Sequence, residues 1–215
     1  MSSVASLAIY GGTFDPVHFG HLRSAVEVYQ ALQVSQLKLI PASVPPHRKM
    51  PSTTREQRLH MLQLATKDLE YLQIDEREIR REGKSFTVDT LASFRDEIGP
   101  AVPLSLVLGA DAYVLLNEWY AWESLAELAH LVILERPGHR EQLPAREVID
   151  WANDRWVADP LCLGGQAAGL MCRLSLTQMD ISATRIREII SQGGNIDFLL
   201  PDTVLQYILK HRIYC

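Results

Sequence analysis

The sequence has 215 residues and a net charge of −5, and 47% of its residues are hydrophobic against 22% charged. The acidic balance argues against a protein that coats nucleic acid, and three cysteines without CxxC spacing argue against zinc and disulfide frameworks. No apolar run approaches a membrane span, and no secretory leader pattern is evident. We therefore expect a single domain over residues 1–215 in a reduced cytoplasmic compartment, with neither nucleic acid nor membrane as a partner.

Short apolar segments alternate with amphipathic ones along the chain. The apolar segments predict strands at 7–10, 37–41, 72–75, 104–108, 131–134 and 174–176. Helical spacing predicts helices at 21–32, 55–67, 87–98, 146–153, 184–191 and 203–211. This alternation predicts an α/β fold, a Rossmann-like doubly wound parallel sheet with helices on both faces and a C-terminal helical segment. Ligands of such sheets bind at the carboxyl ends of the strands.

A glycine-rich motif follows the first predicted strand. Gly11-Gly12-Thr13-Phe14-Asp15-Pro16 leads to His18, Gly20 and His21 at the start of a predicted helix. Glycines allow a tight turn and a close approach to a ligand, and helix N-termini attract anions. Two histidines there can donate hydrogen bonds to phosphate oxygens. The pattern predicts a phosphate site and hence a nucleotide ligand; the alternative is a glycine turn beside two surface histidines.

The same motif resembles the (H/T)xGH signature of the nucleotidylyltransferase superfamily. The resemblance implies that His18 and His21 are catalytic, contacting the phosphates of a nucleoside triphosphate and stabilising the transition state. It further implies that the following residues bind ATP: Gly11, Gly12, Thr13, Phe14, His18, Gly20 and His21.

A second motif is Ile181-Ser182-Ala183-Thr184-Arg185-Ile186-Arg187. Taken alone, it predicts a helix start capped by Ser182 or Thr184, with Arg187 opposed to the helix dipole unless an anion is bound there. The segment resembles the superfamily's ISSTxxR motif. That resemblance implies that Ile181, Ser182, Thr184 and Arg187 bind ATP and that Arg187 is catalytic. Ala183 stands where serine is typical, a change that leaves the backbone N–H contacts in place.

Segments in the middle of the chain narrow the resemblance. Pro45-Pro46-His47-Arg48-Lys49 is followed by 85–90, then by Gly109-Ala110-Asp111 and Trp119-Tyr120. In this order they resemble bacterial nicotinate-nucleotide adenylyltransferases over nearly the whole chain, with 138–173 the least matched stretch. The resemblance implies that these residues bind nicotinate mononucleotide: His47, Arg48, Lys49, Thr87, Asp111, Trp119, Tyr120 and Arg136.

The resemblance also implies separate roles for these residues. Trp119 would stack on the pyridine ring, Thr87 and Tyr120 would receive the carboxylate, and Asp111 would contact the ribose. The basic loop 47–49 would face the mononucleotide phosphate, and the choice between Arg48 and Lys49 stays open. Taken singly, these residues also have purely structural explanations. The basic loop could be a solvated surface, Thr87 and Asp111 could cap helices, and Trp119 could be a core or lid aromatic.

The implied activity joins ATP and nicotinate mononucleotide to give deamido-NAD and pyrophosphate in NAD biosynthesis. The attacking phosphate monoester carries roughly −1.5 to −2 charge at neutral pH, so it needs little or no general base. Positioning and electrostatics then carry the reaction, a direct in-line attack on the α-phosphate of ATP. We expect Mg²⁺ to be carried with ATP, and we assign no protein residue to a metal.

Other functions stay open at this point. One is another nucleotidylyltransferase such as the pantetheine-phosphate enzyme, which is typically shorter and lacks the Trp119-Tyr120 pair. Others are a non-catalytic nucleotide sensor and an interaction scaffold on the same fold. The presence of His18, His21 and Arg187 argues against the sensor. The sequence leaves open the oligomeric state, the strength of the acid preference and the role of residues 138–173.

Overall fold

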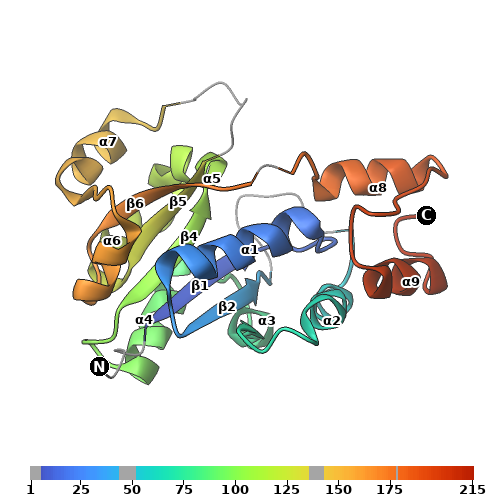
Figure 1. Cartoon of the computed structure of the whole chain (residues 1–215), viewed down its shortest axis with the longest axis horizontal. Helices are drawn as coiled ribbons and strands as arrows, with labels where there is room; N and C mark the ends of the chain where they lie inside the picture. The colour runs from blue at the N-terminus through green and yellow to red at the C-terminus, as the bar shows by residue number, and fades with distance from the viewer. Residues whose placement is uncertain (1–5, 44–51, 136–142, 178) are drawn as a thin grey trace. The chain divides into compact units, whose positions relative to one another are not determined.

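The computed structural model describes residues 6–43, 52–135, 143–177 and 179–215. Strands and helices alternate through these ranges (Figure 1), and none of the helices in them is both long and apolar enough to span a bilayer. The strands are β1 (Leu7–Gly12), β2 (Gln36–Pro41), β3 (Leu72–Ile74), β4 (Leu104–Gly109), β5 (His130–Glu135) and β6 (Met171–Ser175). The α-helices are α1 (Phe19–Leu32), α2 (Arg55–Thr66), α3 (Arg77–Arg80), α4 (Thr87–Ile98), α5 (Ala110–Val114), α6 (Leu125–Leu128), α7 (Arg146–Ala152), α8 (Ala183–Ser191) and α9 (Asp202–Lys210).

Within the described residues, the strands form a six-stranded sheet in the order β3-β2-β1-β4-β5-β6. β1 pairs with β4, β4 with β5 and β5 with β6, each in parallel. The order is that of a dinucleotide-binding Rossmann fold, and it reverses between β1 and β4, where Leu7 lies opposite Leu104. The predicted Rossmann-like α/β fold is confirmed.

The inner strands are buried at every successive position. Residues 104–108 of β4 and 130–134 of β5 are all buried. Successive side chains of a strand point to opposite faces of the sheet, so both faces of these strands are covered. Such double burial is typical of parallel α/β sheets, and it explains why these segments read as continuous apolar runs.

The chain divides into two compact units. One comprises Met1–Tyr10, Glu27–Lys38 and Phe86–Leu176, and the other comprises Gly11–Val26, Leu39–Ser85 and Thr177–Cys215. In the first unit α4 packs against α6. In the second α2 packs against α9, and these two helices lie side by side in Figure 1. That residues 1–215 form a single domain stays a prediction.

Most predicted elements are confirmed, with shifts at their ends. β1 extends to Gly12, and α1 begins at Phe19, two residues before its predicted start. β6 begins at Met171 and not at residue 174, because the exposed Arg173 interrupts its apolar pattern. The short helices α3, α5 and α6 were not predicted, since four or five residues carry too little periodicity.

His130 is a fully buried titratable residue of β5. Its Nδ1 accepts a hydrogen bond from the Leu170 N–H at 3.0 Å, so its Nε2 carries the proton and donates to the Gln166 carbonyl at 2.9 Å. Burial lowers the pKa of His130. The imidazole is therefore held neutral, because a second ring proton would displace the Leu170 donor.

We expect the free energy of unfolding to decrease as the pH falls below the unfolded-state pKa of His130, 6.5. The folded pKa is lowered, so the unfolded chain binds the proton first, and stability falls by up to about 1.4 kcal/mol per pH unit. Urea denaturation between about pH 7.5 and 5.5 measures this loss. His130→Gln keeps a polar side chain without titration, and an unchanged pH slope in that variant would contradict the assignment.

Candidate active site

The glycine-rich motif joins the end of β1 to the start of α1, and its glycines make room for packed rings. A Cβ on Gly12 would lie 2.8 Å from the Phe14 ring, and one on Gly20 would lie 3.0 Å from the His18 ring. Neither glycine has a positive φ. The sequence places the turn at the glycines, and that placement is wrong: Gly12 ends β1, and the turn lies at Asp15 and Pro16. Close packing explains both glycines. Gly11 is exposed, with no described atom within 4 Å of its Cβ position, which leaves space for a ligand.

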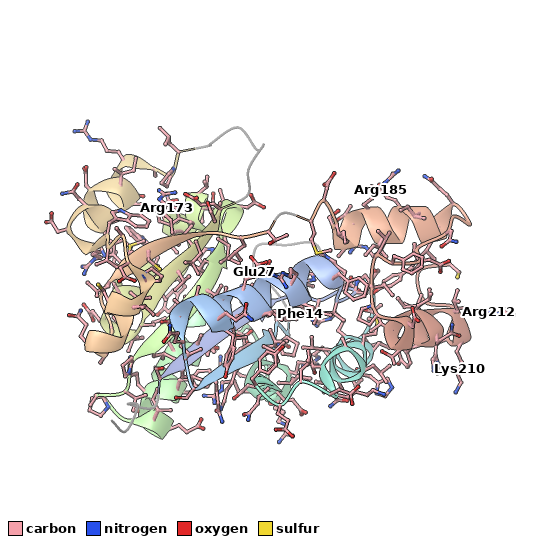
Figure 2. The ribbon with its side chains drawn as sticks, in the orientation of Figure 1. Phe14, Glu27, Arg173, Arg185, Lys210 and Arg212 are labelled. Carbon is pink, nitrogen blue, oxygen red and sulfur yellow. The ribbon has the colours of Figure 1, made fainter. Side chains whose placement is uncertain are left out.

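His18 and His21 lie against each other at the start of α1. Their ring centroids are 3.7 Å apart, with 28° between the planes. The His18 carbonyl accepts hydrogen bonds from the N–H groups of His21 and Leu22, at 3.0 and 3.2 Å. The Phe14 ring, labelled in Figure 2, packs edge-on to His21 at 5.1 Å. The prediction that the two imidazoles lie close together is confirmed, and His18 is buried, not a surface side chain.

Phe14 holds this motif in an unusual backbone conformation. Its φ is +50°, in the left-handed region that a bulky residue rarely adopts, and its side chain is buried. Local strain of this kind persists where the surrounding packing enforces it, and it concentrates at functional sites. The Phe14 ring lies beneath Gly12 and His21, so packing provides that constraint.

The start of α1 also suits an anion electrostatically. Its first turn contains no acidic side chain. The N-terminal end of a helix carries partial positive charge, and its N–H groups can bind phosphate oxygens. Together with the imidazole N–H groups of His18 and His21, the region offers donors to a polyanionic ligand.

Helix α8 begins at Ala183, and Ser182 caps it. Ser182 Oγ accepts a hydrogen bond from the Arg185 N–H at 3.2 Å. Thr184 Oγ1 instead accepts from Arg187 Nη2 at 3.3 Å. Of the two caps considered from the sequence, Ser182 is the one formed, and Thr184 orients Arg187. Ala183 occupies the first helical position, where its side chain has no capping role to lose.

Arg187 connects the second motif to the first. Its Nη1 donates to the Asp15 backbone carbonyl at 2.6 Å, across 172 positions of sequence. The same nitrogen lies 3.9 Å from Asp15 Oδ2. Both motifs belong to one compact unit, and this contact brings the arginine of the second motif to the segment that precedes His18.

Asp15 is a buried carboxylate that sequence reasoning did not include in the site. Its Oδ1 accepts from Thr53 Oγ1 at 2.6 Å and from the Tyr214 hydroxyl at 2.7 Å. Its Oδ2 accepts from the N–H and Oγ of Ser52, at 3.0 and 3.1 Å. Burial raises the pKa of Asp15, but the hydrogen bonds outweigh it and hold that pKa below its usual value. Asp15 is therefore charged at neutral pH.

Arg58 of α2 supports the same motif from within the protein. It is 1% exposed, and its Nη1 donates to the carbonyls of Thr13 and Ala42 at 2.8 and 2.6 Å. Its Nη2 donates to the Ser43 carbonyl at 2.9 Å. Thr13 belongs to the predicted ATP-binding set, so Arg58 fixes part of that set. Sequence reasoning missed it, although its spacing from buried Leu62 places a charge on the apolar face of α2.

The described acceptor residues belong to the other compact unit. Thr87 is the first residue of α4 and is half-buried. Tyr120 is 62% exposed, and its ring packs on Phe86 at 4.8 Å, so it lies beside the start of α4. Asp111 is an exposed residue in the first turn of α5, and Trp119 is half-buried. The structure thus brings Thr87 and Tyr120 into one neighbourhood, with Phe86 as a member that the sequence did not indicate.

Four predicted acceptor residues lie outside the described residues: His47, Arg48, Lys49 and Arg136. Their contacts with the mononucleotide stay predictions.

Part of the stretch whose role the sequence left open supports α5. Trp156 packs edge-on to Tyr113 of α5, with ring centroids 5.9 Å apart. The Arg173 guanidinium, labelled in Figure 2, lies over the Trp156 ring at 4.6 Å. These contacts give the helix that contains Asp111 a fixed support.

Comparison with known proteins identifies the family. The model of the family described as cytidylyltransferase-like matches residues 9–189, which include both motifs. A Chromohalobacter salexigens protein named as a probable nicotinate-nucleotide adenylyltransferase is 44% identical over 211 residues, covering 98% of this chain and 96% of that protein. This chain belongs to the nicotinate-nucleotide adenylyltransferase family. A relative of the same name from Methylococcus capsulatus is 41% identical over 97% of this chain and 99% of its own.

Solved structures agree on the fold of the family. Plasmodium falciparum nicotinic acid mononucleotide adenylyltransferase complexed with NaAD aligns with a TM-score of 0.73 at 15% identity, over 98% of this chain and 97% of that one. The same protein complexed with APC aligns with a TM-score of 0.72. At this identity the likeness concerns the fold alone. The resemblance to nicotinate-nucleotide adenylyltransferases read from the sequence is confirmed by the relatives.

Proposed function

We propose that the protein transfers the adenylyl group of ATP to nicotinate mononucleotide, producing deamido-NAD and pyrophosphate. The hydrogen bond from Arg187 to the Asp15 carbonyl is the main structural support, because it joins the two motifs of the family at one place. The stacked pair His18 and His21 lies in the same compact unit. The substrate class comes from the relatives that are named as probable nicotinate-nucleotide adenylyltransferases, which are 41–44% identical to this chain over nearly its whole length.

The reaction needs charge stabilisation more than acid–base chemistry. An oxygen of the mononucleotide phosphate attacks the α-phosphorus of ATP in line with the bond to the β-phosphate oxygen. The new P–O bond forms as that bond breaks, and its electron pair leaves with pyrophosphate. The attacking oxygen is already ionised, so no general base has to remove a proton. The protein holds two polyanions in register and neutralises the charge that develops.

We assign three catalytic residues: His18, His21 and Arg187. Their N–H groups donate to phosphate oxygens, and donation strengthens as negative charge grows on the departing pyrophosphate. ATP is held by these three together with Gly11, Gly12, Thr13, Phe14, Gly20, Ile181, Ser182 and Thr184. The exposed backbone at Gly11 and the amides at the starts of α1 and α8 supply neutral donors.

Nicotinate mononucleotide is assigned to the second set of residues. Trp119 stacks on the pyridine ring, Thr87 and Tyr120 donate to the carboxylate, and Asp111 accepts from the ribose hydroxyls. The packing of Tyr120 on Phe86 supports this assignment, because it places the phenol beside the start of α4. His47, Arg48, Lys49 and Arg136 complete the set.

We infer that Mg²⁺ arrives with ATP. No three His, Cys, Asp or Glu side chains gather as a metal-holding group in the described parts of the chain, and Asp15 is engaged by four neutral donors. The described side chains therefore fit an ion that is held by phosphate oxygens and water and not by protein carboxylates, as Mg²⁺ commonly is. When bound, the ion neutralises phosphate charge. The small-molecule partners are ATP and nicotinate mononucleotide, and we place the protein in the cytoplasm.

A pyrophosphate-release assay tests the proposal with ATP and three phosphorylated acceptors. Nicotinate mononucleotide should react, with kcat/KM at least about 10-fold above nicotinamide mononucleotide, because a pocket of donors leaves an amide N–H group without an acceptor. Equal values would refute the acid preference. Faster reaction of phosphopantetheine would reassign the acceptor, and ATP binding without pyrophosphate release would favour a sensor.

A further inference from the structure

Tyr214 follows α9 in a conformation that its neighbours enforce. Its φ is +69°, and that of Arg212 is +49°, both in the left-handed region that side-chain-bearing residues rarely adopt. Between them, Ile213 is buried, and its N–H donates to the Ile208 carbonyl of α9 at 3.0 Å. The buried Ile213 thus anchors the segment and directs the adjacent tyrosine. Strained, over-determined positions of this kind justify a search for a role.

The Tyr214 hydroxyl reaches the first motif across 199 positions of sequence, donating to Asp15 Oδ1 at 2.7 Å. Thr53 donates to the same oxygen, and Ser52 donates twice to the other. Burial and the neighbouring Asp15 charge raise the pKa of Tyr214. The phenol therefore remains a hydrogen-bond donor throughout the pH range in which the protein works.

Four neutral donors change what Asp15 does to Arg187. A buried carboxylate usually draws a nearby guanidinium into a close, bidentate pair. Here Arg187 Nη1 bonds the backbone carbonyl of Asp15 at 2.6 Å but stays 3.9 Å from its carboxylate. The hydrogen bonds to Asp15 and Thr184 use two of the five guanidinium N–H donors of Arg187, and its side chain is 31% exposed.

A shallow, open surface pocket of about 320 Å³ adjoins the arginine. It is lined by Ser52, Thr184, Arg187, Glu188, Ser191 and Tyr214. Arg187 and the tyrosine that donates to Asp15 therefore share one surface, on which a phosphate group has room.

We propose that Tyr214 is a positioning residue for the adenylyl transfer: by saturating Asp15, it prevents that carboxylate from capturing Arg187 and keeps the guanidinium directed at the phosphates. The inference rests on the proposed function. Without the hydroxyl, Asp15 Oδ1 has a lone pair to offer to the guanidinium. Arg187 then moves toward Asp15, and its N–H groups leave the triphosphate.

The Tyr214→Phe variant tests this role, since it removes one oxygen and keeps the ring. We expect kcat to fall about 10-fold, the size of one hydrogen bond to a charged group. KM for nicotinate mononucleotide should change less than about twofold, because that ligand is not bound by Arg187. Tyr207→Phe is the matched control: it removes a phenol oxygen from α9, where the ring packs on His60 and His211, and should leave kcat unchanged.

A double-mutant cycle asks whether Tyr214 acts through Arg187. In an Arg187→Lys background, Tyr214→Phe should lower kcat by less than about twofold, because the residue it positions is gone. Independent effects that multiply would overturn the proposal, as would an unchanged kcat in Tyr214→Phe alone. Should Tyr214→Phe fail to fold, Thr53→Val replaces it: the substitution removes the other donor to Asp15 Oδ1 and keeps the side-chain shape, so kcat should fall several-fold for the same reason. An unchanged kcat in folded Thr53→Val would overturn the proposal.

Binding of inorganic tripolyphosphate, measured by calorimetry, separates this inference from the proposed function. If the unmodified protein fails to release pyrophosphate, the enzymatic assignment fails, yet Tyr214→Phe should still weaken tripolyphosphate binding several-fold. Equal affinities in the two proteins, with active unmodified enzyme, would refute the role of Tyr214 and leave the function standing.

Discussion

His21→Ala is expected to lower kcat by about 10²–10³-fold in a protein that remains folded, the usual cost of removing one donor to developing negative charge. The imidazole stacks on His18 at 3.7 Å and meets the Phe14 ring edge at 5.1 Å, so its orientation is set before substrate binds. Pre-orientation of this kind favours the transition state, where charge on the phosphates is greatest. KM for ATP should therefore change much less than kcat. Steady-state pyrophosphate release measures both constants.

The variant His60→Ala is the control for His21→Ala, since it tests whether the loss of any histidine side chain lowers kcat. His60 is an exposed residue of α2 whose ring packs on Tyr207, in the same compact unit as His21. His60→Ala should keep kcat within about twofold of the unmodified protein, as surface substitutions usually do. Thermal unfolding of both variants checks that the fold persists. A near-normal kcat for His21→Ala would remove the histidine pair from the mechanism.

The fold was predictable because it depends on local patterns repeated along the chain. Buried parallel strands must be apolar on both faces, so 104–108 and 131–134 stand out as uninterrupted runs. The ends of the elements were less predictable in the glycine-rich motif of the candidate site. Gly11 and Gly12 look like a turn from composition, but they continue β1, since what requires a glycine at Gly12 is the ring of Phe14 and not a turn. The position of the Phe14 ring depends on tertiary packing, which cannot be read from the composition of the motif.

The candidate site was predictable only where its residues form contiguous motifs. His18, His21 and Arg187 belong to two such motifs, and their resemblance to a family named them. Asp15 lies inside the first motif, but its partners Ser52 and Tyr214 lie 37 and 199 positions away. Nothing in a local window indicates that a tyrosine after the last helix will meet that carboxylate.

Arg58 was predictable from the sequence only in part. It lies on the apolar face of a helix whose ends were predicted within one residue, and a charge on such a face signals either a long side chain reaching solvent or a buried network. Sequence alone does not separate the two. The structure does, since Arg58 is 1% exposed and spans three carbonyl groups.

Arg58→Met should therefore lower the free energy of unfolding by about 3–5 kcal/mol, in the range found when a buried charge network loses a partner. Methionine fills much of the volume but donates no hydrogen bond. The carbonyls of Thr13, Ala42 and Ser43 lose their shared donor, and each buried oxygen left unsatisfied costs about 1–3 kcal/mol. Urea denaturation of the two proteins measures the difference.

Arg55→Met provides the control on the same helix. Arg55 is exposed, and its Nη1 reaches Ser43 Oγ and the Ile79 carbonyl only at 3.3 Å, so its loss should cost less than about 1 kcal/mol. Similar costs for the two arginines would contradict the role given to Arg58. Because Arg58 holds the Thr13 carbonyl, kcat of Arg58→Met should also fall under conditions where the variant is fully folded. A full kcat in that folded state would mean that His18 and His21 keep their geometry without the buried arginine, and that Arg58 serves stability alone.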